Sequence, residues 1–107
     1  MQSATEAERK EFFERARRQA EEDFKRNNRD AAALARWGGA LLELANFMPG
    51  EQASGHVNEA VTKFHQALEI NPSKDDTLWC LGNAYTSQGF LCPSKSEALA
   101  IFDKAKV

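Results

Sequence analysis

The sequence predicts an all-α protein, built as a right-handed stack of about five helices: one leading helix followed by two helical hairpins. Three observations support this fold class. Apolar residues recur at the three- and four-residue spacing of amphipathic helices and almost nowhere alternate. The three prolines, Pro49, Pro72 and Pro93, fall between the periodic segments. Two pairs of these segments repeat along the chain, as expected for an array of hairpins that stack on one another.

The leading helix is expected from about Ser3 to Asn27, with Ser3 and Glu6 spaced as a capping box. Its side chains divide into a charged surface and one apolar stripe. Residues 1–30 carry equal numbers of acidic and basic residues, so we interpret the charged surface as a solvated face rather than a charge-based binding site. The apolar stripe consists of Phe12, Phe13, Ala16, Ala20 and Phe24.

The first hairpin follows at residues 29–72. Asp30 can cap its first helix, which stops at Pro49-Gly50, and the polar stretch from Gly50 to His56 is expected to form a long hairpin loop. The next helix then ends at Asn71-Pro72. The expected core residues are Leu34, Trp37, Leu41, Leu42, Ala45 and Met48 on the first helix, and Val57, Ala60, Val61, Phe64, Ala67 and Leu68 on the second.

The second hairpin, residues 73–107, is incomplete. Ser73 is the expected cap of its first helix and Gly89 its expected stop. Ser94 opens a fifth helix that the chain cuts short. The expected core residues are Leu78, Leu81, Gly82 and Tyr85, then Ala98, Ile101, Phe102 and Ala105.

The two hairpins repeat each other. Gly39 and Leu42 match Gly82 and Tyr85 at an offset of 43 residues. Phe64 matches Phe102 at an offset of 38. We therefore expect residues 57–70 to lie antiparallel to residues 31–47, in one domain that spans residues 1–107.

Composition excludes several function classes. The chain has 107 residues with 14 basic and 16 acidic side chains, a net charge of −2, which argues against sequence-independent binding of nucleic acid. No apolar stretch is long enough to cross a membrane, and no secretory signal is present.

Catalytic and metal-binding motifs are also missing from the sequence. Cys80 and Cys92 lie twelve residues apart, too far for a CxxC pair, and His56 and His65 are isolated. No phosphate-binding glycine loop, nucleophile elbow or zinc-protease motif occurs. The sequence therefore predicts no enzyme, no cofactor and no metal site.

Two motifs resemble the halves of a tetratricopeptide repeat. One is Leu78-x-x-Leu81-Gly82-x-x-Tyr85, and the other is Ala60-x3-Phe64-x2-Ala67-x4-Pro72. The repeat period is about 34 residues, so both hairpins are longer than the consensus. The resemblance implies close helix crossings at the small residues and a gap between hairpins that Phe64 and Tyr85 fill.

Longer runs resemble one family more closely. Residues 36–44, RWGGALLEL, and residues 78–87, LWCLGNAYTS, are similar to the plant twenty-kilodalton receptor subunit of the translocase of the outer mitochondrial membrane. The resemblance implies a cytosol-facing receptor that binds mitochondrial precursor proteins, works with other translocase subunits and is held in the outer membrane by a C-terminal helix. No such tail anchor follows Phe102-Asp103, so we expect a C-terminally truncated chain that is soluble as written.

The resemblance also places a ligand groove on the first helix of each hairpin. Mitochondrial presequences are amphipathic and rich in arginine, so Leu44 and Trp79 would contact the apolar side while Glu43 and Asp76 favour the basic side. The candidate residues are Arg36, Ala40, Glu43 and Leu44 in the first hairpin, and Asp76, Trp79, Asn83, Thr86 and Ser87 in the second.

Three alternatives remain open at this point. Ordinary packing is the favoured interpretation of Trp37, whereas Trp79, which lies off the core stripe, is equally compatible with packing and with ligand contact. A chaperone-docking module would hold an acidic C-terminal tail in a clamp of Lys and Asn side chains; Asn83 fits that clamp, whereas Ala40 and Trp79 do not. A structural scaffold within a complex is the third alternative.

Overall fold

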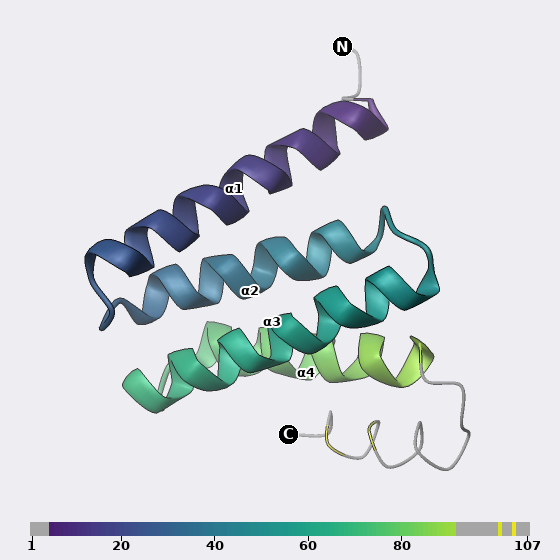
Figure 1. Cartoon of the computed structure of the whole chain (residues 1–107). Helices are drawn as coiled ribbons and strands as arrows, with labels where there is room; N and C mark the ends of the chain where they lie inside the picture. Colours follow the sequence, from purple (N-terminus) through teal and green to yellow (C-terminus); the bar gives the residue numbers. More distant parts are fainter. Residues whose placement is uncertain (1–4, 92–100, 102–103, 105–107) are drawn as a thin grey trace.

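The computed structural model describes residues 5–91, Ile101 and Lys104. Four helices follow one another in residues 5–91: α1 (Glu6–Arg26), α2 (Ala31–Ala45), α3 (Gly50–Ile70) and α4 (Asp75–Leu91). Each helix packs on its neighbours in the chain, and α4 also touches α2. α2 and α3 are antiparallel, as predicted (Figure 1). The all-α stack is thus confirmed, while the predicted fifth helix and the 38-residue repeat lie almost wholly outside the described residues.

The starts of the first two helices show how local side chains satisfy backbone amides. The side chain of Thr5 accepts a hydrogen bond from the Glu8 amide at 3.1 Å, so Thr5 caps α1 and the prediction of Ser3 was wrong. Thr5 and Glu8 have the same spacing as Ser3 and Glu6, which explains the two-residue error. At α2 the predicted cap is confirmed, because Asp30 accepts from the Ala33 amide at 3.0 Å.

The predicted long loop is a helix. α3 begins at Gly50, and the Pro49 carbonyl accepts from the Ala53 amide at 2.9 Å. Ala53 and Val57 are both buried and pack with Ala45 of α2. This apolar packing outweighs the low helix propensity of glycine, so the extra residues of the hairpin lengthen α3 instead of forming a loop.

α4 also differs from its predicted limits. It begins at Asp75, which leaves Ser73 outside the capping position; the Ser73 hydroxyl instead bonds the Asn71 side chain at 3.4 Å. Gly89 was predicted to end the helix, but it is buried within it, and α4 continues to Leu91. A glycine at a plausible position in the sequence is therefore not sufficient to end a helix.

Phe64 lies at the centre of the core. It is fully buried, together with Leu41 of α2 and Leu81 and Ala84 of α4. A Cβ atom built on Gly38 would lie 2.7 Å from Cε1 of Phe64, closer than two carbons can approach. A larger residue at position 38 would therefore force the Phe64 ring to shift where α2 crosses α3.

The contact between Gly38 and Phe64 changes the alignment of the two hairpins. Gly38, and not Gly39, contacts Phe64, so the two hairpins align at an offset of 44 residues rather than 43. The equivalent motifs are Leu34-x-x-Trp37-Gly38-x-x-Leu41 and Leu78-x-x-Leu81-Gly82-x-x-Tyr85. Burial does not separate the two registers, because each offset pairs three residues that are buried in both helices; at 44 residues they are Ala33 and Thr77, Ala40 and Ala84, and Ala45 and Gly89.

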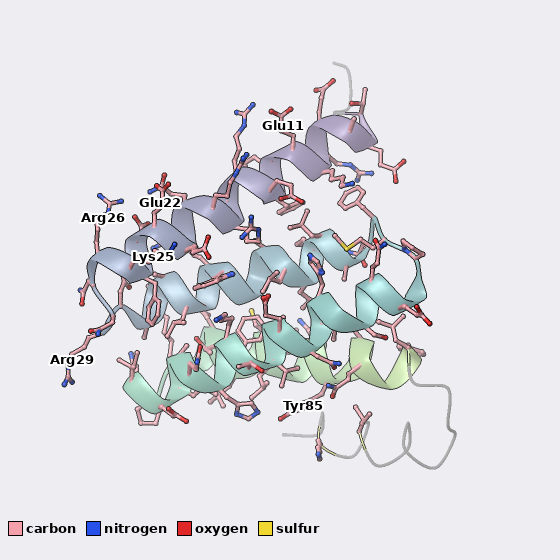
Figure 2. All side chains as sticks on the ribbon, viewed as in Figure 1. Glu11, Glu22, Lys25, Arg26, Arg29 and Tyr85 are labelled. Atoms are coloured by element: carbon pink, nitrogen blue, oxygen red, sulfur yellow. The ribbon has the colours of Figure 1, made fainter. Side chains whose placement is uncertain are left out.

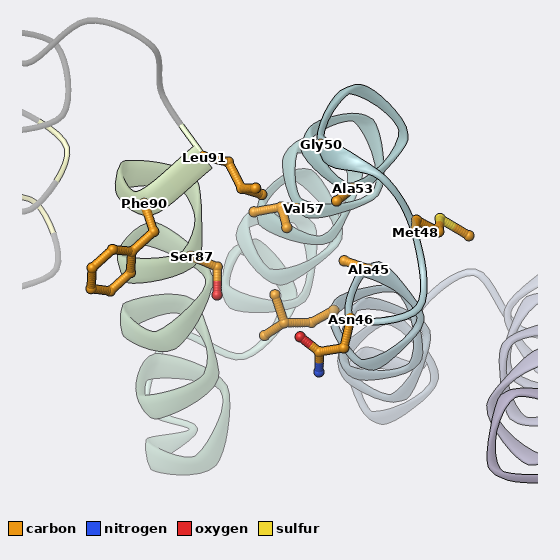
Figure 3. Close-up of a pocket in the computed structure, with 10 residues that line it drawn as sticks. Ala45, Asn46, Met48, Gly50, Ala53, Val57, Ser87, Phe90 and Leu91 are labelled. Carbon is orange, nitrogen blue, oxygen red and sulfur yellow. The ribbon is translucent and has the colours of Figure 1, made fainter. Parts of the chain in front are cut away.

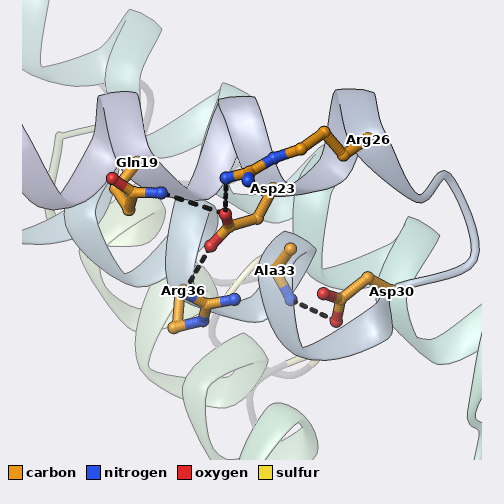
Figure 4. A network of polar contacts seen from close by, with 6 residues as sticks. All are labelled: Gln19, Asp23, Arg26, Asp30, Ala33 and Arg36. Atoms are coloured by element: carbon orange, nitrogen blue, oxygen red, sulfur yellow. Dashed lines mark hydrogen bonds and ion pairs between the residues drawn. The ribbon is translucent and has the colours of Figure 1, made fainter.

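α1 is held against α2 near the turn that joins them. The Phe24 ring lies 6.2 Å from the Trp37 ring. The Asp23 carboxylate accepts hydrogen bonds from Gln19 at 3.0 Å, Arg26 at 2.7 Å and Arg36 of α2 at 3.1 Å (Figure 4). The bonds from Gln19 and Arg36 lower the pKa of Asp23 below its usual value.

The opposite side of α1 is a solvated face. Glu11, Glu22 and Arg26 point away from α2 (Figure 2). Glu11 pairs with Arg15 one turn later at 2.8 Å, and both side chains are exposed. Among the predicted apolar residues of α1, Ala20 is fully buried whereas Phe12 is 66% exposed.

Candidate functional site

Two recesses flank α2, and together they are the best candidates for a binding surface in the described part of the chain. We call them the α2/α4 recess and the α1/α2 recess. The α2/α4 recess has a volume of about 270 Å³ and lies among three helices; it is lined by Leu42, Ala45, Asn46, Met48, Gly50, Ala53, Val57, Ser87, Phe90 and Leu91. The α1/α2 recess has a volume of about 350 Å³ and is lined by Phe12, Phe13, Ala16, Gln19, Arg36, Gly39, Ala40 and Glu43.

Most of the side chains that line the α2/α4 recess are apolar. From α4, Leu91 and Ser87 face Val57 of α3, and Asn46, directly after α2, closes the opposite side (Figure 3). Among the residues that the structure describes, no charged side chain lines this recess. It is therefore suited to apolar side chains of a ligand.

The α1/α2 recess is also chiefly apolar, but charged groups stand at its edge. The Arg36 guanidinium and the Gln19 amide are both engaged with Asp23. Glu43 is exposed and forms no ion pair with any described residue. Among the described residues that line this recess, Glu43 is thus the charged side chain without an ion-pair partner.

The predicted groove residues of the first hairpin do not form one groove with those of the second. Arg36, Ala40 and Glu43 line the α1/α2 recess, on the side of α2 that faces α1. Ala40 is only 5% exposed, and Leu44 is fully buried. The assignment of Leu44 as a ligand contact was wrong. The sequence alignment was off by one residue, and it therefore placed Leu44 on the surface although this residue lies in the core.

The predicted residues of the second hairpin are spread along α4. Trp79 is 75% exposed, as expected for a residue off the core stripe, but it lines neither recess. Asp76 and Asn83 are exposed as well. The Thr86 hydroxyl donates to the Gly82 carbonyl at 3.0 Å, so it is already satisfied within the helix. Ser87 is the candidate that lines the α2/α4 recess.

Sequence reasoning missed part of the floor of the α2/α4 recess. Met48 and Val57 were predicted as core residues, but Ala53 was placed in a loop although it belongs to the first turn of α3. A signal was available: Ala53, Val57, Ala60 and Phe64 continue one helical face without a break.

No chemical centre competes with these recesses in the described residues. His65 bonds the Tyr85 hydroxyl at 2.6 Å, which links α3 to α4. Burial, with a smaller effect of Asp76, raises the pKa of the Cys80 thiol, so this cysteine is less readily ionised. Among the described residues, no group of three or more His, Cys, Asp or Glu side chains could bind a metal, and no helix is long and apolar enough to cross a membrane.

Comparison with known proteins gives one consistent result. The family described as "Plant specific mitochondrial import receptor subunit TOM20" matches residues 7–107. Mitochondrial import receptor subunit TOM20-3 of Arabidopsis thaliana is 49% identical over 105 residues, which cover 98% of this chain and 52% of that protein. Subunit TOM20-2 of the same plant is 44% identical over 103 residues, 96% of this chain and 49% of its own length.

The chain thus spans about half the length of the curated relatives it matches. Their names describe a receptor and no catalytic activity, which agrees with the prediction that the chain is not an enzyme. The match extends over nearly all of the chain, including the four described helices and both recesses. The chain belongs to the family of the plant-specific mitochondrial import receptor subunit TOM20.

Proposed function

We propose that this chain is the ligand-binding part of a mitochondrial import receptor, and that the α2/α4 recess takes the apolar face of presequence helices. Its ligands are precursor proteins delivered from the cytosol, and its neighbours are other subunits of the outer-membrane translocase. The names of the relatives support the receptor role. The observation that carries the choice of site is the apolar recess among α2, α3 and α4.

The geometry suits a helix better than an extended peptide. The described helices leave no sheet edge to which a strand could add, so backbone pairing is not offered here. An amphipathic helix presents leucine side chains on one face, and Leu42 and Met48, which are only half-buried, provide apolar surface for them. Trp79 lies eight residues before Ser87 on α4, about 12 Å along the helix, so a ligand that extends along α4 reaches it.

The chaperone-tail alternative has weaker support. In the corrected register Asn83 aligns with Gly39, which offers no side chain to a carboxylate. Trp79 aligns with Ala35, so neither hairpin has a basic residue at the position that the clamp requires. We therefore retain the presequence as the proposed ligand.

Three glycines allow a direct test of the site. A Cβ atom on Gly39, Gly50 or Gly55 would meet no atom within 4 Å, so each accepts a side chain. Gly50 lines the α2/α4 recess, whereas Gly55 lines neither recess. We expect Gly50→Leu to fill the recess and weaken a presequence peptide about tenfold or more, while Gly55→Leu leaves the dissociation constant unchanged.

The measurement is a titration with a basic amphipathic presequence peptide, followed by NMR of alanine methyl groups, in which Ala45 and Ala53 report on the recess. An acidic chaperone-tail peptide is the matched comparison. Equal binding by Gly50→Leu and the parent chain would remove the α2/α4 recess as the site. Binding of the acidic tail alone would replace the proposed ligand.

Trp79→Ala tests how far the ligand extends. Because Trp79 is largely exposed, the variant should fold normally, with unchanged circular dichroism. Loss of an aromatic contact should weaken the peptide by about 1–3 kcal/mol. Unchanged affinity would confine the ligand to the recess itself.

A further inference from the structure

We propose that two copies of this chain exchange α1, so that α1 of each copy packs on α2 of the other. The partner is a second copy of the chain, and the interaction surface is the side of α2 that α1 covers in the single copy (Figure 1). The exchange involves only α1, α2 and the link between them, residues 27–30. It therefore goes beyond the proposed function and does not depend on the α2/α4 recess.

α1 is attached to the other described helices through one neighbour. Among these helices it packs on α2 alone, whereas α2 and α3 each pack on at least two others. Ala20 is the one buried residue of α1, compared with seven in α2 and five in α3. Separating α1 from its own α2 therefore exposes little of the core, and the same contacts form again in the exchanged dimer.

The interactions that stabilise α1 as a helix do not need α2. The Thr5 side chain caps its first turn. Glu11 forms an ion pair with Arg15 at 2.8 Å, and Asp23 forms one with Arg26 at 2.7 Å, both within the helix. α1 keeps these local interactions while it moves from one copy to the other.

The link allows α1 and α2 to become one continuous helix. Residues 27–30 contain no glycine or proline, and none of the four has a positive φ, so all of them can adopt helical dihedral angles. The turn is held by side-chain bonds instead. Oδ1 of Asn27 accepts from the Arg29 amide at 3.1 Å, and Oδ1 of Asp30 accepts from the Ala33 amide at 3.0 Å. A short link of this kind favours exchange between copies.

The contacts between α1 and α2 suit a two-fold dimer. Near the link, Arg36 lies 3.1 Å from Asp23. Far from the link, the Arg9 guanidinium lies 5.9 Å from the centre of the Phe47 ring, directly after α2. Contacting residues thus lie at similar distances on the two sides of the link. Two continuous helices that run antiparallel and meet at their links bring the same residues together, each from the other copy, and close the dimer.

The first test makes the link helical. Asn27→Ala combined with Asp30→Ala removes both side-chain bonds of the turn and raises helix propensity. After refolding from urea at roughly 10 μM and roughly 1 mM, analytical ultracentrifugation measures monomer and dimer. We expect the dissociation constant of the dimer to fall about tenfold or more relative to the parent chain. Asn71→Ala should leave it unchanged, because Pro72 opposes a continuous helix in the α3–α4 turn.

The second test distinguishes exchange of α1 from side-by-side association. In the link variant, one chain also carries Asp23→Arg and another carries Arg36→Asp. Each chain alone places like charges between α1 and α2, whereas a mixed dimer with exchanged helices pairs opposite charges at both contacts. Changes within one helix, such as loss of the Arg26 contact to Asp23, are equal in mixed and unmixed dimers and cancel.

Native mass spectrometry after joint refolding separates mixed from unmixed dimers, because the two chains differ in mass. We expect mixed dimers to outnumber unmixed ones about threefold or more at low salt, and less at high salt. Equal numbers would show that the copies associate without exchanging α1, and would overturn the proposal. A link variant that is helical by circular dichroism but monomeric at the higher concentration would also overturn it.

Discussion

α2 and α4 are equivalent helices with different surroundings. α2 lies between α1 and α3, and its buried residues are Ala33, Leu34, Gly38, Ala40, Leu41, Leu44 and Ala45. α4 packs on α3 through Thr77, Leu81 and Ala84. Its Leu78, Gly82 and Tyr85, which match Leu34, Gly38 and Leu41, are only half-buried.

The comparison teaches that neighbouring helices, and not residue type, set the burial of a repeat position. Leu34 and Leu78 are the same residue at the same repeat position, yet Leu34 is 1% exposed and Leu78 is half-buried. Neighbouring helices also form the candidate binding sites. Both recesses lie beside α2, where it meets α1 on one side and α3 and α4 on the other.

Phe64→Ala should cause the largest loss, because this ring supports α2 and α4 at once. The side chain is fully buried in the cluster that contains Leu41 and Leu81. We expect a decrease of about 3–5 kcal/mol in the free energy of unfolding, measured by urea denaturation. Phe12→Ala, at an exposed phenylalanine, should change stability by less than about 0.5 kcal/mol. Similar losses in both variants would contradict the central role of Phe64.

Leu34→Ala and Leu78→Ala measure the comparison directly. Leu34→Ala should cost about 2–4 kcal/mol, because it removes a buried side chain and leaves a cavity. Leu78→Ala should cost about half as much, since water already reaches that side chain. Urea denaturation of both variants under the same conditions gives the difference. If Leu78→Ala is the more damaging change, the burial contrast between α2 and α4 is wrong.

The helical stack could be predicted from spacing, but its register could not. Apolar periodicity located each of α1 to α4 and the core residues Leu41, Phe64 and Leu81. Gly38 and Gly39 are adjacent and identical, so the sequence does not show which of them meets Phe64. Only the helix crossing decides this, and a shift of one residue rotates every assignment on a helix by about 100°.

This register error affected the prediction of the candidate site more than the prediction of the fold. Leu44 was taken as a surface residue and is buried, whereas Leu42, taken as core, lines the α2/α4 recess. Gly50 to His56 was taken as a loop because glycine and polar residues dominate it, but tertiary packing of Ala53 and Val57 overrides local propensity. The recesses depend on contacts between helices, which no single segment specifies.

Gly38→Ala and Gly39→Ala form the sharpest test of the register. Alanine at position 38 would place Cβ 2.7 Å from the buried Phe64 ring, which should cost more than the gain in helix propensity and give a net loss of about 1 kcal/mol. Alanine at position 39 meets open space and should stabilise the protein by about 0.5–1 kcal/mol. Thermal unfolding measures both, and opposite signs are the expected result. The reverse order of stability would restore the offset of 43.

The smallest expected effect concerns the contact that α2 has and α4 lacks, the polar attachment of α1 through Asp23. Hydrogen bonds from Gln19 and Arg36 lower the pKa of this carboxyl in the folded protein, whereas in the unfolded chain it is about 3.9. The ionised form is favoured by folding, so its contribution is complete above about pH 4 and is lost as the pH falls through the lowered pKa. Asp23→Asn should therefore lower the melting temperature at pH 7 and have less effect at pH 2.5.

Glu11→Gln is the control, because Glu11 also has a lowered pKa but pairs with Arg15 inside α1. If the melting temperatures of Asp23→Asn and the parent chain differ by the same amount at both pH values, the carboxylate does not hold α1 on α2, and the apolar contact of Phe24 with Trp37 is the attachment that matters.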